Sequence, residues 1–289
     1  MQWRQKVAET LSAHFGCDVA LHRVDPVGGG SINRTYRLST SHGQFFAKVN
    51  SFSAYPDMFQ KEARGLNMLL EADTIAVPKP LTIGAAGDQA FLLMPYIESA
   101  KQRDDFWPLF GQQLAQLHQR THSTFGLDHD NYIGSLVQNN TPHERWCDFF
   151  IHQRLEPQLK MARDNGKADV SVSQAFSRLF YQLDDFFPAE PPALLHGDLW
   201  SGNYLAGQRG EPVVIDPAVY FGHREMDLGM TRLFGGFHPE FYYAYDMGYP
   251  LEKGWKKRVD ICNLYPLMVH VNLFGGGYLS EVKSVLRGF

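Results

Sequence analysis

The segment Leu195-His196-Gly197-Asp198-Leu199-Trp200-Ser201-Gly202-Asn203 decides how this chain is interpreted. A second aspartate, Asp216, follows thirteen residues after its last residue and ends the apolar run Val213-Val214-Ile215. The Asp-x-x-x-x-Asn spacing is typical of phosphoryl-transfer loops, which need a carboxylate at the attacking hydroxyl and oxygen ligands for Mg²⁺. It predicts Asp198 as the base or the group that orients the hydroxyl, with Asn203 and Asp216 as metal ligands. Asx-turn hydrogen bonds are the alternative use of such loop residues.

A lysine in the N-terminal half offers a partner for this loop. Lys48 lies in the strand-like run Phe45-Phe46-Ala47-Lys48-Val49, and alternation places it on a face apolar enough to be buried. Glu62, fourteen residues later, falls in a predicted helix. A strand lysine paired with a helix glutamate is the arrangement that directs an ammonium at the α and β phosphates of ATP. A surface lysine with an extended stem is the alternative.

Upstream of Lys48, the chain contains a glycine-rich turn, Gly28-Gly29-Gly30-Ser31-Ile32-Asn33. It matches only the first two glycines of G-x-G-x-x-G and lies between two predicted strands, which excludes a Rossmann dinucleotide site. A Walker motif is also absent, because Gly166-Lys167 is followed by Ala168. The turn predicts ATP-binding residues Gly28, Gly29, Gly30 and Ser31.

The segment from Leu92 to Glu98 is predicted to be a hinge, where backbone groups reach adenine and apolar side chains cover its faces. A plain strand end between domains is equally consistent with this segment. The hinge hypothesis assigns ATP contacts to Met94, Tyr96, Ile97 and Glu98.

The periodicity predicts an α+β fold with two lobes. Strands are expected at 19–24, 35–39, 44–49, 78–85 and 89–97, with apolar helical stripes at 3–15 and 59–70. Beyond residue 98 long helices dominate, at 106–117, 146–161 and 172–187, and two short strands, 194–195 and 213–215, present their loops at one place. The boundaries are 1–97 for a small antiparallel-sheet lobe that binds nucleotide and 98–289 for a helical lobe with the catalytic loop.

Composition restricts the class of protein. The 289 residues are 44 % apolar, enough for a large core, and 27 basic against 31 acidic residues leave no positive field for nucleic acid or lipid. Cys17, Cys147 and Cys262 lie far apart, and the charged N-terminus does not resemble a signal peptide, so a reducing cytoplasm is expected. The uncharged stretch 261–280 contains Pro266 and several polar residues, which predicts a core element and no membrane span.

Four segments together resemble the fructosamine-3-kinase (ketosamine-3-kinase) family, within the protein-kinase-like fold of aminoglycoside and choline kinases. They are 195–203, Ile215-Asp216-Pro217-Ala218, Gly222-His223-Arg224-Glu225-Met226-Asp227-Leu228 and Leu233-Phe234-Gly235-Gly236-Phe237. The resemblance implies ATP and Mg²⁺ as cofactors and a ketosamine as acceptor, phosphorylated on its 3-hydroxyl. Ribulosamine, erythrulosamine or fructosamine on protein lysines or free amines would be the substrates, and deglycation the result.

Two candidate substrate contacts accompany this resemblance. Trp200 is predicted either as a platform for the apolar face of the sugar or as a plug beneath the catalytic loop. Arg224 is the second candidate. For Glu225 and Asp227 we expect a bracing role, with the carboxylates bound to backbone amides or to Arg224.

Departures from the wider pattern limit the resemblance. Asp216-Pro217-Ala218 replaces Asp-Phe-Gly, so no phenylalanine flip or phosphorylated activation loop is expected, and Ser31 stands where some relatives carry a redox-active cysteine. Two alternatives stay open: a kinase for an aminoglycoside, choline or another amino alcohol, and a non-catalytic nucleotide-binding module. The sequence predicts no nucleic-acid or membrane partner and leaves the oligomeric state open.

Overall fold

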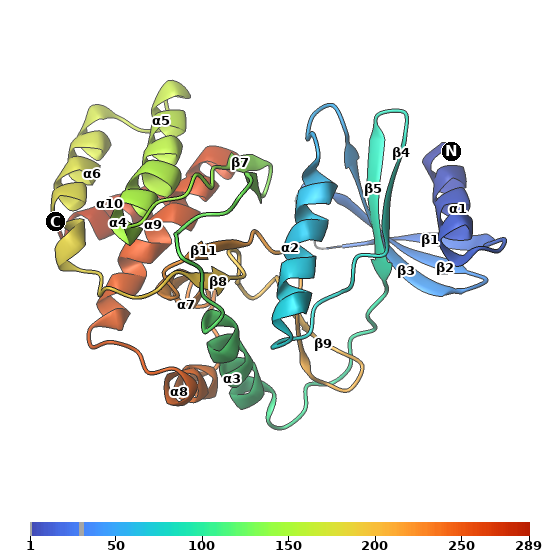
Figure 1. The fold of residues 1–289 in the computed structure, drawn as a ribbon. Helices are drawn as coiled ribbons and strands as arrows, with labels where there is room; N and C mark the ends of the chain where they lie inside the picture. The colour runs from blue at the N-terminus through green and yellow to red at the C-terminus, as the bar shows by residue number, and fades with distance from the viewer. Residues whose placement is uncertain (1, 29–31) are drawn as a thin grey trace. The chain divides into compact units, whose positions relative to one another are not determined.

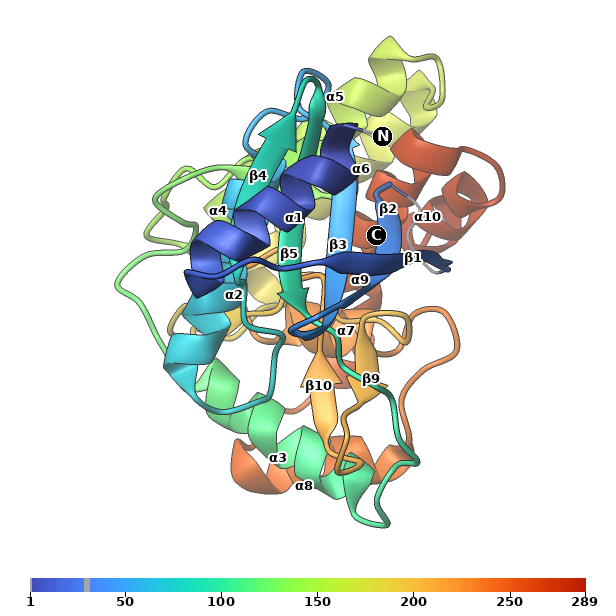
Figure 2. The same ribbon diagram turned by 90° about the vertical axis from the view of Figure 1, so that its right-hand side faces the viewer.

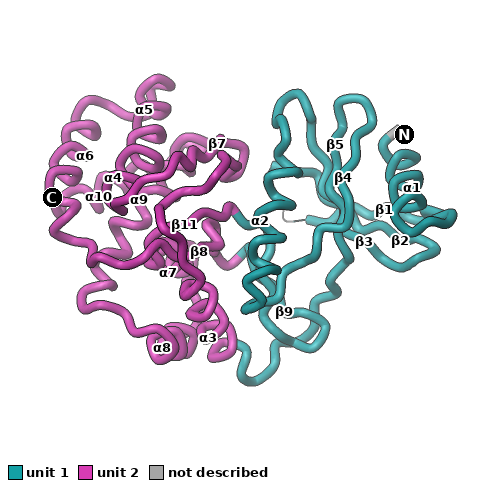
Figure 3. The backbone as a smooth tube through the Cα atoms, viewed as in Figure 1, with its two compact units in different colours: residues 1–106, 202–217 teal, residues 107–201, 218–289 magenta. Residues whose placement is uncertain are grey.

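The structure is a computed structural model that describes residues 2–28 and 32–289. Gly29, Gly30 and Ser31 of the predicted nucleotide turn lie outside the described residues. The chain forms two compact units, Met1–Phe106 with Gly202–Pro217, and Trp107–Ser201 with Ala218–Phe289 (Figure 3). We call them unit 1 and unit 2. Unit 1 thus includes residues 98–106 and 202–217, which the predicted boundary between residues 97 and 98 assigns to the helical lobe. The division into a nucleotide-binding lobe and a catalytic lobe stays a prediction.

A five-stranded antiparallel sheet forms the centre of unit 1. Its order is β1-β2-β3-β5-β4, with β1 Leu21–Val27, β2 Arg34–Thr40, β3 Gly43–Ser51, β4 Thr82–Ala86 and β5 Gln89–Pro95. All five predicted strands are confirmed, with ends displaced by a few residues. The glycine-rich turn therefore joins two neighbouring antiparallel strands, as expected.

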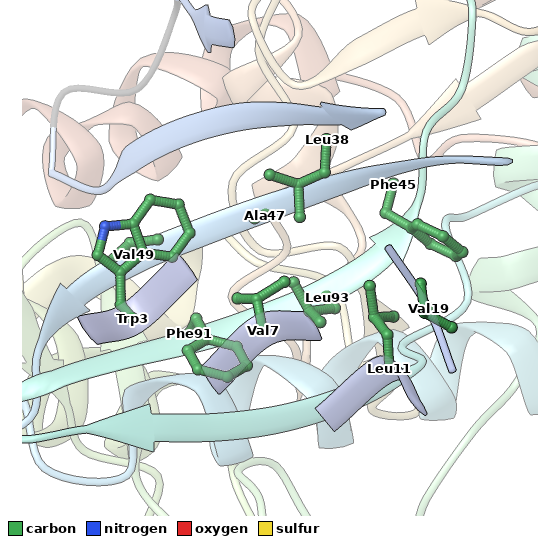
Figure 4. Packing of buried hydrophobic residues seen from close by; sticks show 10 residues of the cluster. All are labelled: Trp3, Val7, Leu11, Val19, Leu38, Phe45, Ala47, Val49, Phe91 and Leu93. Carbon is green, nitrogen blue, oxygen red and sulfur yellow. The ribbon is translucent and has the colours of Figure 1, made fainter. Parts of the chain in front are cut away.

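Two helices cover opposite faces of this sheet (Figures 1 and 2). Helix α1, Gln2–Phe15, places Trp3, Val7 and Leu11 in an apolar cluster with residues of β2, β3 and β5 (Figure 4). Helix α2, Met58–Ala72, lies on the other face. Because side chains alternate along β3, Ala47 enters the α1 cluster and Lys48 is directed to the side of α2.

The two predicted short strands belong to different sheets. Strand β10, Pro212–Val214, pairs with β9, Tyr204–Ala206, in unit 1. Strand β8, Ala193–Leu195, pairs with β11, Tyr220–Gly222, in unit 2. Strands β9 and β10 form a hairpin, whereas β8 and β11 pair across the segment of the chain that contains this hairpin. The periodicity did not predict β9 or β11.

Unit 2 is mainly helical, and its long helices match the predicted segments with local changes. The segment 146–164 is continuous but contains a π-helical turn at Phe150–Leu155, and the helix predicted to end at 187 ends at Gln182. The remaining short sheet pairs β6, Asn131–Ile133, with β7, Leu136–Gln138. The described helices are α3 Phe106–His118, α4 Trp146–Phe149, α5 Glu156–Asp164, α6 Val170–Gln182, α7 Glu225–Met230, α8 Pro239–Gly248, α9 Trp255–Phe274 and α10 Tyr278–Leu286, with a 3₁₀ turn at Leu183–Asp185.

Helix α9 contains most of the uncharged stretch at 261–280. Most of its residues from Arg258 to Asn272 are buried in unit 2, and Pro266 lies inside the helix. Among the described residues, no helix has the length and apolar character needed to cross a membrane. The expectation of a core element is confirmed.

Candidate active site

Lys48 is buried between two carboxylates within unit 1. Its ammonium lies 2.5 Å from Glu62 Oε1 and 2.7 Å from Asp216 Oδ1, and its side chain is 3 % exposed. Burial lowers the pKa of Lys48, but Asp216 and Glu62 outweigh burial and hold this pKa above its ordinary value. The predicted ion pair with Glu62 is therefore confirmed, and the positive charge is fixed at the loop that carries Asp216.

The two predicted metal ligands lie at the same end of the β9–β10 hairpin. The Ile215 backbone N–H donates to the Asn203 carbonyl at 3.0 Å, which places Asp216 one residue beyond this pairing. Asp216 adopts a left-handed backbone conformation, φ 56°, and its side chain is 42 % exposed. The hairpin thus brings the backbones of Asn203 and Asp216 close together although the two residues are thirteen positions apart.

The donor chemistry of this pair fits Mg²⁺. Asn203 and Asp216 supply amide and carboxylate oxygens, which are hard ligands. Across residues 2–28 and 32–289, no group of three or more His, Cys, Asp or Glu side chains could form a metal cage. Mg²⁺ is commonly held by only one or two carboxylates, with water and phosphate oxygens completing its shell, so this open pair is the appropriate type of site.

The remaining predicted nucleotide contacts also belong to unit 1. Gly28 follows β1, and beyond the turn Asn33 accepts a hydrogen bond from Asn50 of β3 at 2.7 Å. Met94 is a buried residue of β5, and the backbone N–H of Tyr96 donates to the Gln44 carbonyl. These contacts position Asn33 and the strand end. The role of Gly28, Met94, Tyr96, Ile97 and Glu98 in ATP binding stays a prediction.

Asp227 holds the start of the predicted catalytic loop, residues 196–203, in unit 2. Its carboxylate accepts hydrogen bonds from the backbone N–H groups of His196, at 2.7 Å, and Gly197, at 2.9 Å. Burial raises the pKa of Asp227, but hydrogen bonds and the charges of His118 and His196 outweigh it and leave this pKa below its ordinary value. The bracing role expected for Asp227 is confirmed, and Asp198 follows directly after the two anchored residues.

His118 completes this brace from helix α3. One ring nitrogen lies 3.2 Å from Asp227 and the other 2.8 Å from the Tyr245 hydroxyl. The imidazole is fully buried. Its contacts with Tyr245 and Asp227 fix the orientation of the ring, and the ring helps to orient the Asp227 carboxylate at the start of the loop.

A close backbone contact fixes the same loop from the other side. Gly197 has φ +84°, and a Cβ atom added there would lie 2.1 Å from the Ala218 carbonyl oxygen. The Ala218 N–H donates to the His196 carbonyl at 2.9 Å. Only glycine fits this position, because both the backbone conformation and the space exclude a side chain.

Sequence reasoning missed a buried polar network behind this contact. Gln138 donates to the Ala218 carbonyl and to Asn131, and Asn131 donates to the Val219 carbonyl. The fully buried Arg154 donates to the Asn140 side chain, which bonds Asn131. The polar residues Asn131 and Gln138 of the short strands β6 and β7 were a signal in the sequence.

Trp200 lies in a group of aromatic side chains in unit 2. Its ring centroid is 6.1 Å from that of Phe234, in an edge contact, and the Phe234 ring is 4.8 Å from His270. The Trp200 side chain is partly exposed. A half-covered indole two residues after Asp198 can present a flat apolar surface to a ligand.

Arg224 has its donors engaged within the protein. Its guanidinium forms a bidentate pair with Glu190, at 2.7 and 2.8 Å, and donates to the carbonyls of Tyr249 and Pro250. Its side chain is 3 % exposed. These partners favour a structural role, and the substrate contact of Arg224 stays a prediction. The expected bracing partner of Glu225 was wrong, because Glu225 pairs with Arg258 at 2.6 Å.

The structure therefore divides the predicted residues between the units. Unit 1 brings together Lys48, Glu62, Asn203 and Asp216, and unit 2 holds Asp198 and Trp200. The peptide bonds from Ser201 to Gly202 and from Pro217 to Ala218 join these two groups.

With this geometry established, comparison with known proteins identifies the family. The fructosamine kinase family model matches residues 3–289. The chain belongs to the fructosamine kinase family. A protein of Enterococcus faecium named as a probable ketoamine kinase is 42 % identical over 273 residues, covering 92 % of this chain and 95 % of the relative. The chloroplastic protein-ribulosamine 3-kinase of Arabidopsis thaliana is 39 % identical, with 92 % and 82 % covered.

Solved structures agree with this assignment. A candidate fructosamine-3-kinase from Haemophilus somnus superimposes with a TM-score of 0.88 and 28 % identity, covering 98 % of this chain and 96 % of the other. An aminoglycoside phosphotransferase from Alicyclobacillus acidocaldarius gives a TM-score of 0.52 and 13 % identity, with 97 % and 94 % covered, and shares the fold alone. The predicted protein-kinase-like α+β fold is confirmed, and this fructosamine kinase family member is a kinase that uses ATP.

Proposed function

We propose that this chain is an ATP-dependent kinase that phosphorylates the 3-hydroxyl of ketosamines, with ribulosamine and erythrulosamine as acceptors and fructosamine as a further one. The buried Lys48 between Glu62 and Asp216 carries the proposal, since a fixed ammonium beside an acidic metal ligand suits polyphosphate binding. Family membership and the name of the Arabidopsis relative support the acceptor class. The phosphorylated adduct would decompose and release the amine, which gives deglycation.

In the proposed mechanism, positioning and charge neutralisation supply most of the rate. Lys48 would hold the α and β phosphates, the turn at Gly28–Ser31 would cover them, and the strand end at Met94–Glu98 would hold adenine. Mg²⁺ would neutralise developing charge on the phosphates while Asn203 and Asp216 hold it. Asp198 would accept the proton of the acceptor hydroxyl, and Trp200 would bind the apolar face of the ketosugar.

A side-by-side assay tests the acceptor class. Phosphate transfer from ATP is measured with ribulosyl-lysine, fructosyl-lysine and an aminoglycoside, in the presence and absence of Mg²⁺. We expect transfer to the ketosamines only, with ribulosyl-lysine preferred. Transfer to the aminoglycoside alone would identify a different small-molecule kinase.

Asp198→Asn provides the matched control. The amide keeps the shape of the side chain but cannot accept the proton, so turnover should fall by about 10²–10⁴-fold while ATP affinity stays unchanged. ATP binding without turnover in the wild-type chain would instead indicate a nucleotide-binding module. The cytoplasmic location expected from the cysteine pattern stays part of this proposal.

A further inference from the structure

A pocket that the proposed chemistry does not use opens on unit 2. Its cavity volume of about 410 Å³ lies within the range of small-molecule sites. Helix α8, the start of α9 and the turn at 231–237 form its walls. The lining residues are Arg232, Phe237, Pro239, Tyr242, Tyr243, Asp246, Trp255 and Lys256.

Arg232 gives this pocket an exposed positive group beside two aromatic rings. Its guanidinium carbon lies 5.5 Å from the ring centroid of Tyr242 and 5.8 Å from that of Trp255, and these two rings stack at 6.0 Å. Among the described residues, Arg232 has no carboxylate within ion-pair distance. A planar guanidinium that lies beside aromatic rings can bind a carboxylate through two parallel hydrogen bonds.

The other charged groups leave the pocket net positive. The Lys256 ammonium lies 5.9 Å from the Trp255 ring centroid. The single lining carboxylate, Asp246, accepts a hydrogen bond from the Leu251 N–H at 2.7 Å, which holds it to the backbone. Two cations against one anion favour an anionic ligand.

The pocket is built on a turn that also contacts the catalytic loop. The Tyr242 hydroxyl donates to the Thr231 carbonyl at 3.2 Å and accepts from the Phe237 N–H at 3.4 Å, so it holds both ends of the turn. Between these ends lies Phe234, whose carbonyl accepts a hydrogen bond from the Ser201 hydroxyl at 3.4 Å. The ring of Phe234 contacts the ring of Trp200.

This placement suits the amine carrier of a ketosamine. With the 3-hydroxyl at Asp198, about nine single bonds separate C3 of a lysine-linked sugar from the lysine α-carboxyl carbon, a span of roughly 11 Å. Trp200 and Ser201, which follow Asp198, both contact Phe234, and Arg232 lies two residues before Phe234 on the same turn. We propose that the Arg232 pocket is a carrier subsite that binds a carboxylate next to the modified amine.

This proposal rests on the proposed function and deepens it. The carboxylate has two possible sources, the α-carboxylate of a free amino acid and an acidic side chain in a modified peptide. The test therefore uses two matched pairs of acceptors. The first pair is Nα-acetyl-Nε-ribulosyl-lysine and its α-carboxamide, and the second is a ribulosyl-lysine peptide amide with a neighbouring Glu or Gln.

KM and kcat for both pairs are measured with the wild type, Arg232→Gln and Lys256→Gln. Lys257→Gln is the control, because it removes the same charge from the same helix outside the pocket lining. We expect Arg232→Gln to raise KM for the carboxylate acceptor about tenfold, with kcat and the KM of the amide acceptor unchanged. Lys256→Gln should give a smaller effect in the same direction, and Lys257→Gln none.

The pair that shows this Arg232-dependent preference identifies the source of the carboxylate. Equal changes for both members of each pair, or no change in either, would overturn the carrier subsite and leave the proposed function intact. If the wild-type chain phosphorylates none of the four ketosamines, the proposed function fails, and the subsite fails with it.

Discussion

At the scale of single residues, the buried charge of Lys48 has two partners with different tasks. Glu62 is part of α2 and is nearly buried, whereas Asp216 is partly exposed on the hairpin loop. Removing the ammonium leaves the Glu62 carboxylate buried without its cation, which typically costs about 3–5 kcal/mol. The same change removes the group proposed to hold the phosphates.

Lys48→Met and the double variant Lys48→Met/Glu62→Gln separate these effects. We expect the single variant to lower the free energy of unfolding by about 3 kcal/mol and the double variant to recover most of that loss. Neither should recover phosphate transfer. Urea unfolding and turnover are the measurements, and a double variant as unstable as the single one would contradict the ion-pair argument.

His223 predicts a pH dependence of stability. It is fully buried beside Glu190, with the Trp146 and Phe187 rings against it. Burial, together with the charges of Arg224 and Arg258, lowers its pKa to about 4 although Glu190 opposes the shift. The unfolded chain binds this proton near pH 6.5 and the folded chain only near pH 4. The unfolded state therefore binds more protons between these values, and stability falls on acidification.

We expect the free energy of unfolding to decrease by up to about 3 kcal/mol between pH 6.5 and pH 4 through this residue. Urea unfolding at a series of pH values measures the slope in the wild type and in His223→Gln. The variant should lose this part of the slope. A slope of unchanged size in the variant would assign the pH dependence to other groups.

At the scale of elements, the catalytic loop is held by backbone contacts that leave no room for a side chain at Gly197. Gly197→Ala introduces both a left-handed conformation and the 2.1 Å contact with the Ala218 carbonyl. Gly166→Ala is the matched control, since Gly166 has φ +66° and nothing within 4 Å of an added Cβ.

We expect Gly166→Ala to cost about 1–2 kcal/mol, the cost of the backbone conformation alone. Gly197→Ala should cost clearly more and should also reduce turnover, because the neighbouring Asp198 is displaced. Urea unfolding and phosphate transfer test both. Equal costs for the two variants would show that the loop can move away from Ala218 without strain.

At the scale of the whole molecule, the chain passes three times between its two compact units, at 106–107, 201–202 and 217–218. Residues proposed to bind nucleotide and metal belong to unit 1, and the proposed base belongs to unit 2. A ligand that binds only the folded state stabilises it, by about 2.7 kcal/mol at a concentration of 100 times Kd.

Thermal unfolding with ATP therefore tests the metal assignment. We expect ATP with Mg²⁺ to raise Tm more than ATP alone, and Asp216→Asn to lose the Mg²⁺-dependent part, because an amide is a weaker ligand than a carboxylate. EDTA should reduce the wild type to the value for ATP alone. An Asp216→Asn variant with the full Mg²⁺ effect would exclude Asp216 as a ligand.

Several features of the site follow from local sequence patterns. Alternation along the strand and helical spacing predicted that Lys48 and Glu62 meet. The Asp198–Asn203 spacing together with Asp216 predicted the loop and the broad fold, and Trp200 with the segment 224–228 pointed to the family. The hairpin that brings Asn203 to Asp216 is also short in sequence. These features depend on residues close together in the chain, where the period of a strand or helix and the chemistry of a loop determine the neighbours.

Other features depend on contacts between distant residues. The sequence did not predict the Glu190–Arg224 pair, the Glu225–Arg258 pair, the network from Arg154 to Ala218, or the assignment of 202–217 to unit 1. The sequence by itself determined the fold family, the five strands of the unit 1 sheet, the main helical segments and the kinase chemistry. Only the tertiary structure decided which buried charges pair and which side chains hold each loop. The reason is that a buried polar group must form hydrogen bonds, and the packing of the chain determines which partner lies near it.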